Sequence, residues 1–333
     1  MRSGSSSKWI LHLEGGGWCA TMEECVERST TDLGSSNSWV SSYEFDGFLS
    51  DNAQSNPDFY DWNMVYIMYC DGASFSGNVD TPVPWNSTTT IYFRGLKVLN
   101  AVLQSLLDAG MKDASEVILT GCSAGGLATY IHADYVAGFI PPQAKYRALS
   151  DAGYFLDIPT IYGNMSFEEG VKNLLTLQNC TALNEECVKA YSIQDQWKCL
   201  FAPYTIQYIK TPVFILNSDY DTAQLAGIVD LPCLPPNCTV QQMKFFYKFR
   251  TQFLSALEPA THNADVGIFV DSCLQHCQTL TDNTWNDIIV EGSSMREAFE
   301  AWYGGKPLQY IDCAYPCNPT CPQATTPPAY IKI

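Results

Sequence analysis

The chain has 333 residues, of which 46% are hydrophobic and 16% charged, and this is enough for one large domain with a substantial core. The net charge of −17 argues against nucleic-acid binding, and four histidines leave little material for a metal centre. No run of about 18 or more apolar residues occurs, so no membrane span is predicted. We therefore expect residues 1–333 to form a single domain.

The sequence predicts six strands, over 9–13, over 62–69, over 117–120, ending near 150, over 212–217 and over 266–270. Helices are predicted over 91–109, 124–136 and 240–257. The first strand leads into the glycines at 15–17, and Gly110 ends the first helix. Residues 160–205 are expected to form a helical insertion that carries cysteines, and residues 313–333 a surface tail. Alternating strands and helices predict an α/β fold, with a mostly parallel sheet covered by helices on both faces.

Fourteen cysteines are an even and high number for this length. Zinc binding is one interpretation, because Cys313, Cys317 and Cys321 are spaced like ligands, but no paired C-x2-C knuckle occurs. Disulfides are the better interpretation. Sequons for N-glycosylation support a secreted, oxidising context and begin at Asn86, Asn164, Asn179 and Asn237. Because no signal peptide is predicted at the start of the chain, we expect a truncated amino end.

Residues 121–125 read Gly-Cys-Ser-Ala-Gly and stand between a predicted strand and a predicted helix. The G-x-S-x-G pattern in this context is typical of the nucleophile elbow of α/β-hydrolases, so we expect an α/β-hydrolase-like fold. Its turn is too tight for side chains at Gly121 and Gly125, and it lifts the hydroxyl of Ser123 out of the sheet. Ser123 is therefore the candidate nucleophile.

A serine nucleophile needs a histidine base, which follows the serine and the acid in the chain order of this fold class. His12 lies within a strand, where its side chain is buried or supports the sheet. His132 lies about 13 Å along the elbow helix and cannot reach back. His262 precedes a strand and lies at the wrong end of the sheet. His276 follows the last predicted strand at its carboxyl end, where ligands bind, and is the candidate base.

The orienting acid is expected after the strand 212–217, where Asp219 and Asp221 are both possible. We favour Asp221, because the loop must first turn away from the edge of the sheet. Asp219 is an alternative cap for the following helical turn.

An acyl-transfer enzyme also needs N–H donors for the developing oxyanion. One donor is expected from Ala124, and another from the glycine loop at 15–17. This loop lacks the Gly-Lys-Ser/Thr continuation of a phosphate loop, and a simple tight turn is the other alternative. No cofactor is required.

Together these motifs resemble the plant pectin acetylesterase family, which is related to the animal secreted carboxylesterase Notum. The resemblance covers nearly the whole chain and is carried by the segments 13–19, 92–95, 119–128, 150–153, 211–217, 220–221, 272–278 and 313–321. It implies a Ser123–Asp221–His276 triad and oxyanion donors at Gly16, Gly17 and Ala124. The Notum branch has Trp where Gly17 stands, which favours the pectin branch. Family members also carry a signal peptide and several dozen residues ahead of the glycine loop.

The resemblance implies a secreted cell-wall esterase, expected to be a monomer, that removes acetyl groups from polysaccharide, with pectin as the first candidate substrate. The alternatives are a Notum-like lipid-ester or palmitoleoyl-protein carboxylesterase and a catalytically silent wall-binding protein. Trp18 is a candidate for stacking on sugar rings. Arg94 is a candidate counter-charge for an acidic substrate, although we favour a structural salt bridge as its role. For the cysteines near the site, we expect Cys19 to pair with Cys25. Cys122 is expected to be either buried or bonded to a neighbouring strand end such as Cys70.

Overall fold

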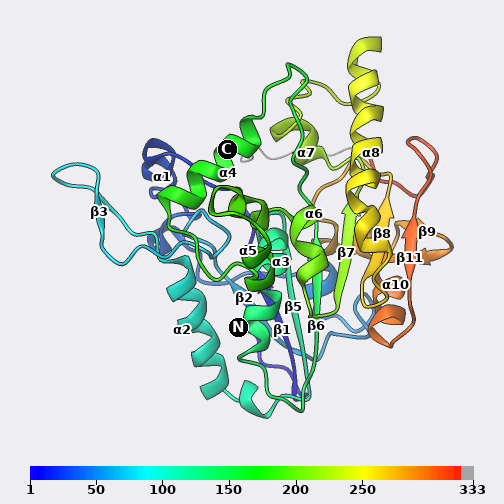
Figure 1. The fold of residues 1–333 in the computed structure, drawn as a ribbon. Coiled ribbons are helices and arrows are strands. Elements are labelled where there is room, and N and C mark those ends of the chain that lie inside the picture. Colours follow the sequence, from blue (N-terminus) through cyan, green and yellow to red (C-terminus); the bar gives the residue numbers. More distant parts are fainter. Residues whose placement is uncertain (324–333) are drawn as a thin grey trace.

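The computed structural model describes residues 1–323, and a seven-stranded sheet forms its centre (Figure 1). Every pair of neighbouring strands in this sheet is parallel, which confirms the predicted α/β class. The strands, in their order across the sheet, are β11 (Gln309–Ile311), β8 (Gly267–Asp271), β7 (Val213–Ser218), β6 (Lys145–Asp151), β5 (Glu116–Cys122), β1 (Lys8–Leu13) and β2 (Asn63–Ile67). Two antiparallel pairs lie outside it, β3 (Val83–Pro84) with β4 (Thr90–Ile91) and β9 (Ile289–Val290) with β10 (Ser293–Ser294).

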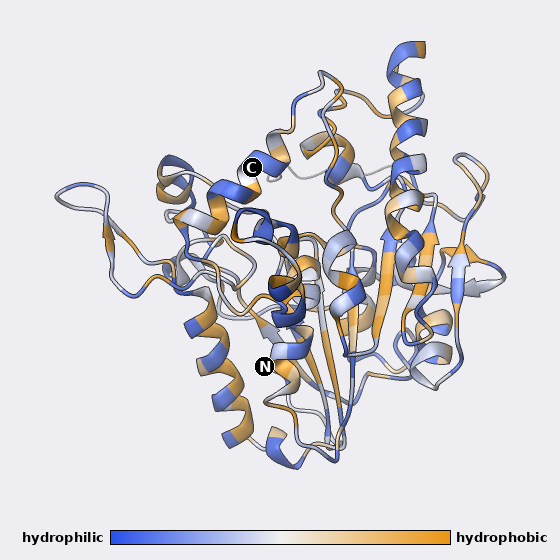
Figure 2. Ribbon diagram, in the orientation of Figure 1, coloured by the Kyte–Doolittle hydropathy of each residue, from blue (hydrophilic) through white to orange (hydrophobic). Residues whose placement is uncertain are grey.

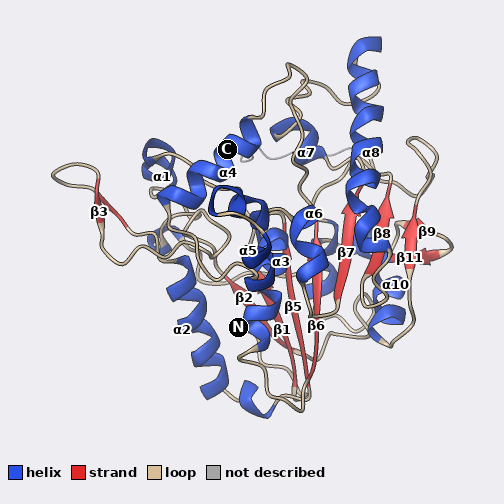
Figure 3. Cartoon of the chain, in the orientation of Figure 1, coloured by secondary structure: helices blue, strands red, loops and turns tan. Residues whose placement is uncertain are grey.

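Helices cover both faces of the sheet, as predicted (Figure 3). One face packs against α2 (Gly95–Asp108), α3 (Ala124–Ala137), α4 (Ser166–Leu177), α6 (Ala202–Thr205) and α8 (Val240–Thr261). The other face packs against α9 (Asp282–Trp285), α10 (Met295–Tyr303) and aromatic residues between 48 and 62. The remaining helices are α1 (Met22–Arg28), α5 (Glu185–Ala190) and α7 (Thr222–Gly227). Figure 2 shows the central strands as largely hydrophobic, in keeping with burial on both faces.

Several predicted boundaries differ from the structure. The helix expected from residue 91 begins at Gly95, because β4 takes up residues 90–91, and Gly110 follows it with a φ of +116°. The segment 160–205 contains α4, α5, α6 and a 3₁₀ segment at Ile193–Leu200. The short edge strand β11 was not predicted, because its three residues contain no apolar run.

Six disulfides lie within the described residues, and Cys70 and Cys180 are half-buried free thiols. The pairs are Cys19–Cys25, Cys122–Cys277, Cys187–Cys199, Cys233–Cys238, Cys273–Cys321 and Cys313–Cys317. This confirms disulfides over zinc, and confirms the pairing of Cys19 with Cys25.

The pairing expected between Cys122 and Cys70 is wrong. Cys122 bonds Cys277 because the end of β5 meets the loop after β8, a contact between segments 155 residues apart that no local pattern reveals. Residues 313–323 of the predicted tail are exposed or half-buried, and residues 324–333 lie outside the described residues. No helix of the described chain is long and apolar enough to cross a membrane.

Glycine is required where the first turn of α3 passes the end of β1. A Cβ atom at Gly125 would lie 2.0 Å from the carbonyl oxygen of Leu13, and one at Gly121 would lie 2.3 Å from that of Gly125. Both neighbours are backbone atoms of the sheet and of the elbow helix, so neither can move away without displacing these elements.

The glycine contact predicts that Gly125→Ala destabilises the fold by about 3 kcal/mol or more, because overpacking here must move backbone. Gly138→Ala, at the other end of the same helix, is the matched control, since its φ of −66° suits alanine and its closest Cβ contact is 3.3 Å. Thermal unfolding followed by circular dichroism measures both. Equal Tm values for the two variants would contradict the close approach.

Candidate active site

The three residues expected to do chemistry follow three strands at the carboxyl edge of the sheet. Ser123 comes directly after β5, Asp221 lies three residues after β7, and His276 lies five residues after β8. Carboxyl ends of parallel strands meet at one edge of a sheet, so the topology gathers these residues from distant parts of the sequence.

Ser123 occupies a strained turn between β5 and α3. Its φ of +60° and ψ of −124° are rare for a residue with a side chain, and its N–H donates to the carbonyl oxygen of Asp151 at 3.0 Å. A Cβ atom at Gly15 would lie 3.0 Å from the Cβ of Ser123, so a glycine lets the loop after β1 lie against the serine. This geometry is that of a nucleophile elbow.

His276 and Asp221 form a buried pair. Their Nδ1 and Oδ2 atoms are 2.8 Å apart, and the other oxygen of Asp221 accepts the N–H of Gln224 at 2.9 Å as the N-cap of α7. The alternative cap, Asp219, instead contacts Arg250 at 2.7 Å and does not cap α7. Only 8% of the His276 side chain is exposed, and its Nε2 has no hydrogen-bond partner among the described residues. This nitrogen is therefore free to take a proton from a hydroxyl in the pocket.

The pKa of His276 reflects two opposing effects. Burial favours the neutral imidazole, but the charge of Asp221, its hydrogen bond and the charge of Asp151 outweigh burial and raise the pKa above its ordinary value of 6.5. Asp151 is held in place by the N–H and hydroxyl of Thr279, both at 2.7 Å.

The Cys122–Cys277 disulfide connects the two halves of the site. Cys122 precedes Ser123, and Cys277 follows His276, with 5.4 Å between the two Cα atoms. This bond limits how far the loop after β8 can move from the elbow.

A pocket of about 210 Å³ contains both Ser123 and His276. The glycine loop at residues 15–17 forms another part of its wall. Its remaining lining residues are His12, Glu14, Tyr66, Cys122, Cys277 and Leu280.

Carbonyl contacts fix the orientation of the glycine loop. Arg28, the last residue of α1, donates from Nη1 to the carbonyl oxygen of Gly16 at 2.8 Å, and the Tyr69 hydroxyl donates to that of Gly17 at 2.9 Å. The C=O and N–H of one peptide unit point in opposite directions, so Arg28 turns the Gly17 N–H away from itself. Neither the Gly16 nor the Gly17 N–H has a backbone acceptor within residues 1–323. These donors are available to an oxyanion.

Ser74 connects the glycine loop to the elbow. Its hydroxyl donates to the carbonyl oxygen of Ala124 at 2.8 Å and accepts the indole N–H of Trp18 at 2.7 Å, while its backbone N–H donates to the Tyr69 hydroxyl. Trp18 is 6% exposed and packs on Phe155, so the expectation that it stacks on sugar rings is wrong. It supports the loop instead.

The other histidines lie where the sequence placed them. His132 is buried in α3 with Nε2 2.9 Å from the carbonyl oxygen of Ser74, and His262 is exposed beside Glu258. His12 is buried in β1 and stacked on Tyr66, but it also lines the pocket of Ser123, which the sequence analysis did not anticipate.

The contacts that Arg94 and Arg28 make could not be predicted from the sequence. Arg94 forms no ion pair among the described residues and lies over the ring of Tyr92 at 5.0 Å, so the expected salt bridge is wrong. Arg28 was missed, because its contact with Gly16 depends on how α1 packs. Glu14 and Tyr66 were also missed. Glu14 directly precedes the glycine loop in the sequence, and this position indicates that it lies beside the pocket of Ser123.

An elbow serine, a buried His–Asp pair and free N–H donors at the edge of a parallel sheet define the α/β-hydrolase class. The pectinacetylesterase family model matches residues 2–322. Pectin acetylesterase 5 of Arabidopsis thaliana is 39% identical over 96% of this chain and 78% of its own length, and pectin acetylesterase 4 is 38% identical over 96% and 80%. The chain belongs to the pectinacetylesterase family and is a carboxylic ester hydrolase.

The fold also matches a second branch of esterases. The crystal structure of the Wnt deacylase Notum from Drosophila has a TM-score of 0.87 and 28% sequence identity, covering 96% of this chain and 93% of that one. The palmitoleoyl-protein carboxylesterase notum2 of Xenopus laevis is 29% identical over 95% of this chain and 68% of its own length.

The Arg28 contact predicts that Arg28→Met lowers kcat for p-nitrophenyl acetate by about tenfold with little change in KM. This is less than the ~10²- to 10³-fold loss of a whole oxyanion donor, because the Gly17 N–H remains but loses its fixed direction. Arg147→Met is the matched control, since Arg147 also donates to a backbone carbonyl, that of Tyr146, but on β6. Equal kcat values for the two variants would exclude a positioning role for Arg28.

The pKa of His276 predicts the acid limb of the pH profile. A base must be neutral, so kcat/KM should rise with pH through a midpoint above 6.5. Asp221→Asn removes the charge and the carboxylate hydrogen bond that raise the pKa, so the midpoint of the residual activity should move to lower pH. Hydrolysis of p-nitrophenyl acetate between about pH 5 and 9 tests this, and an unmoved midpoint in the variant would contradict it.

Proposed function

We propose that Ser123, His276 and Asp221 act as a catalytic triad that removes acetyl groups from acetylated cell-wall polysaccharide, with pectin as the main substrate. The observation that carries this proposal is the His276–Asp221 contact of 2.8 Å in a pocket shared with the elbow serine. The pectin acetylesterases at 39% and 38% identity support the choice of acyl group and polymer.

In the proposed reaction, Nε2 of His276 takes the proton of Ser123 while Oγ attacks the acetyl carbonyl carbon. The N–H groups of Gly16, Gly17 and Ala124 stabilise the oxyanion, and Asp221 stabilises the imidazolium. His276 then gives its proton to the departing sugar hydroxyl, which leaves an acetyl ester on Ser123. Water, activated by the same histidine, releases acetate and restores the serine. No cofactor takes part.

The pocket volume favours a short acyl group. About 210 Å³ around Ser123 accommodates an acetyl ester and the sugar carbon that carries it, whereas a long acyl chain would have to extend beyond this pocket. The Notum-like alternative, a lipid-ester carboxylesterase, is favoured by the TM-score of 0.87 and by the 29% identity to notum2, which is lower than the identity to the pectin acetylesterases. A catalytically silent wall-binding protein is not supported, because the proposed triad is complete.

We also propose that the protein is secreted to the cell wall and acts there as a monomer. Six disulfides among the described residues require an oxidising compartment to form. Sequons at Asn86 and Asn164 are consistent with passage through the secretory route.

Ser123→Ala is expected to lower acetate release from acetylated pectin by at least about 10⁴-fold, because it removes the nucleophile. Ser105→Ala is the matched control, since Ser105 is an exposed serine on α2. Comparing p-nitrophenyl acetate with p-nitrophenyl octanoate separates the two esterase classes, and we expect the acetate to be preferred. Surviving activity in Ser123→Ala would refute the triad, and an octanoate preference would favour the lipid-ester alternative.

A further inference from the structure

A series of aromatic rings leads outward from the catalytic pocket. His12 stacks on Tyr66 with 5.2 Å between ring centroids, and Tyr66 stacks in turn on Tyr43 at 5.7 Å. Phe45 contacts both tyrosines, at 5.2 Å from Tyr66 and 6.1 Å from Tyr43. We call Tyr43, Phe45 and Tyr66 the aromatic shelf. It joins β2 to the loop ahead of Gly47.

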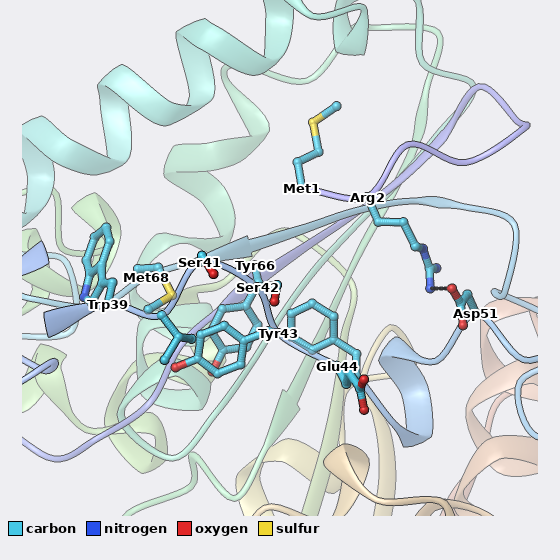
Figure 4. A pocket seen from close by; sticks show the side chains of 12 residues that line it. Met1, Arg2, Trp39, Ser41, Ser42, Tyr43, Glu44, Asp51, Tyr66 and Met68 are labelled. Atoms are coloured by element: carbon cyan, nitrogen blue, oxygen red, sulfur yellow. Dashed lines mark ion pairs between the residues drawn. The ribbon is translucent and has the colours of Figure 1, made fainter.

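The shelf forms part of a second, larger pocket of about 710 Å³ (Figure 4). Tyr66 lines both this pocket and the one that holds Ser123, so the two are neighbours. In Figure 4, Trp39 lies beyond Tyr43 at one end of the larger pocket, and Arg2 and Asp51 lie at the other end. A polymer whose ester group enters the small pocket therefore has space for an adjoining unit in the large one.

The chemistry of the shelf suits a sugar ring. Tyr43 is 45% exposed although it packs against Phe45 and Tyr66. Its side chain combines an apolar ring face with a polar hydroxyl group at the ring edge. A pyranose has apolar C–H faces and a polar edge of hydroxyl groups, so it matches a flat amphipathic surface. Exposed apolar surface next to a reactive pocket is typical of a binding site.

The charges around the shelf disfavour an acidic sugar. Three carboxyl groups line the two pockets, those of Glu14, Glu44 and Asp51. Burial raises the pKa of Glu14 to about 7, and Asp51 is matched by Arg2, so Glu44 carries the unpaired negative charge. The only Lys or Arg among the lining residues is Arg2, whose guanidinium is 3.7 Å from Asp51 and is thus already matched by a carboxylate. A further carboxylate bound here would meet the charge of Glu44 and would find no unpaired Lys or Arg among the lining residues.

We propose that the aromatic shelf is a subsite for an uncharged pyranose unit next to the acetylated one, such as a methyl-esterified uronic acid or a neutral sugar. This inference rests on the proposed function and adds a substrate preference to it. The enzyme then acts on esterified stretches of the polymer and poorly on de-esterified, polyanionic ones.

Direct binding tests the shelf without relying on catalysis. The probe is a methyl-esterified oligogalacturonide without acetyl groups, titrated into the wild-type protein and its variants by calorimetry. Tyr43→Ala should raise Kd about twofold to tenfold, as expected for one lost stacking contact. Tyr60→Ala is the matched control, because Tyr60 is 40% exposed and lies before the amino end of β2, away from the active edge. Equal Kd values for the two variants would overturn the proposal.

The charge preference is tested with the same oligosaccharide after removal of its methyl esters. The wild type should bind the esterified form more tightly, and Glu44→Gln should narrow the difference between the two forms. Tighter binding of the free acid would overturn the inference. Failure of the triad, in contrast, shows as activity in Ser123→Ala, so the two proposals fail by different measurements.

Discussion

The Cys122–Cys277 disulfide constrains the whole site, because it bonds the residue before the candidate nucleophile to the residue after the candidate base. The two segments are 155 residues apart and follow strands that are not neighbours in the sheet. The bond adds a covalent restraint to the hydrogen bonds that hold the loop after β8, from His276 to Asp221 and from Thr279 to Asp151.

The backbone segments proposed to bind the oxyanion, the glycine loop and Ala124, are held in a different way, by hydrogen bonds to their carbonyl groups. Arg28 and Tyr69 each hold one carbonyl of the glycine loop, and Ser74 holds that of Ala124. These contacts restrain the backbone without using the N–H groups that the reaction needs. Preorganised donors need little rearrangement when charge develops, which is the main source of their effect on rate.

Local patterns were enough to predict the elbow, the six long strands and the placement of Asp221 and His276, because strand ends in a parallel sheet meet at one edge. Local patterns did not predict contacts that depend on tertiary packing. The partner of Cys122 and the role of Arg28 depend on segments that only the fold brings together. Trp18 was expected at the surface as a large aromatic beside the site, but its N–H is satisfied internally by Ser74.

In the proposed triad, His276 activates Ser123. Reaction with a fluorophosphonate, followed by peptide mass mapping, tests it most directly, because this reagent labels serines that an adjacent base has made nucleophilic. We predict one adduct, on the peptide containing Ser123, and its loss in His276→Ala. An adduct on another serine, or undiminished labelling of Ser123 in His276→Ala, would contradict it.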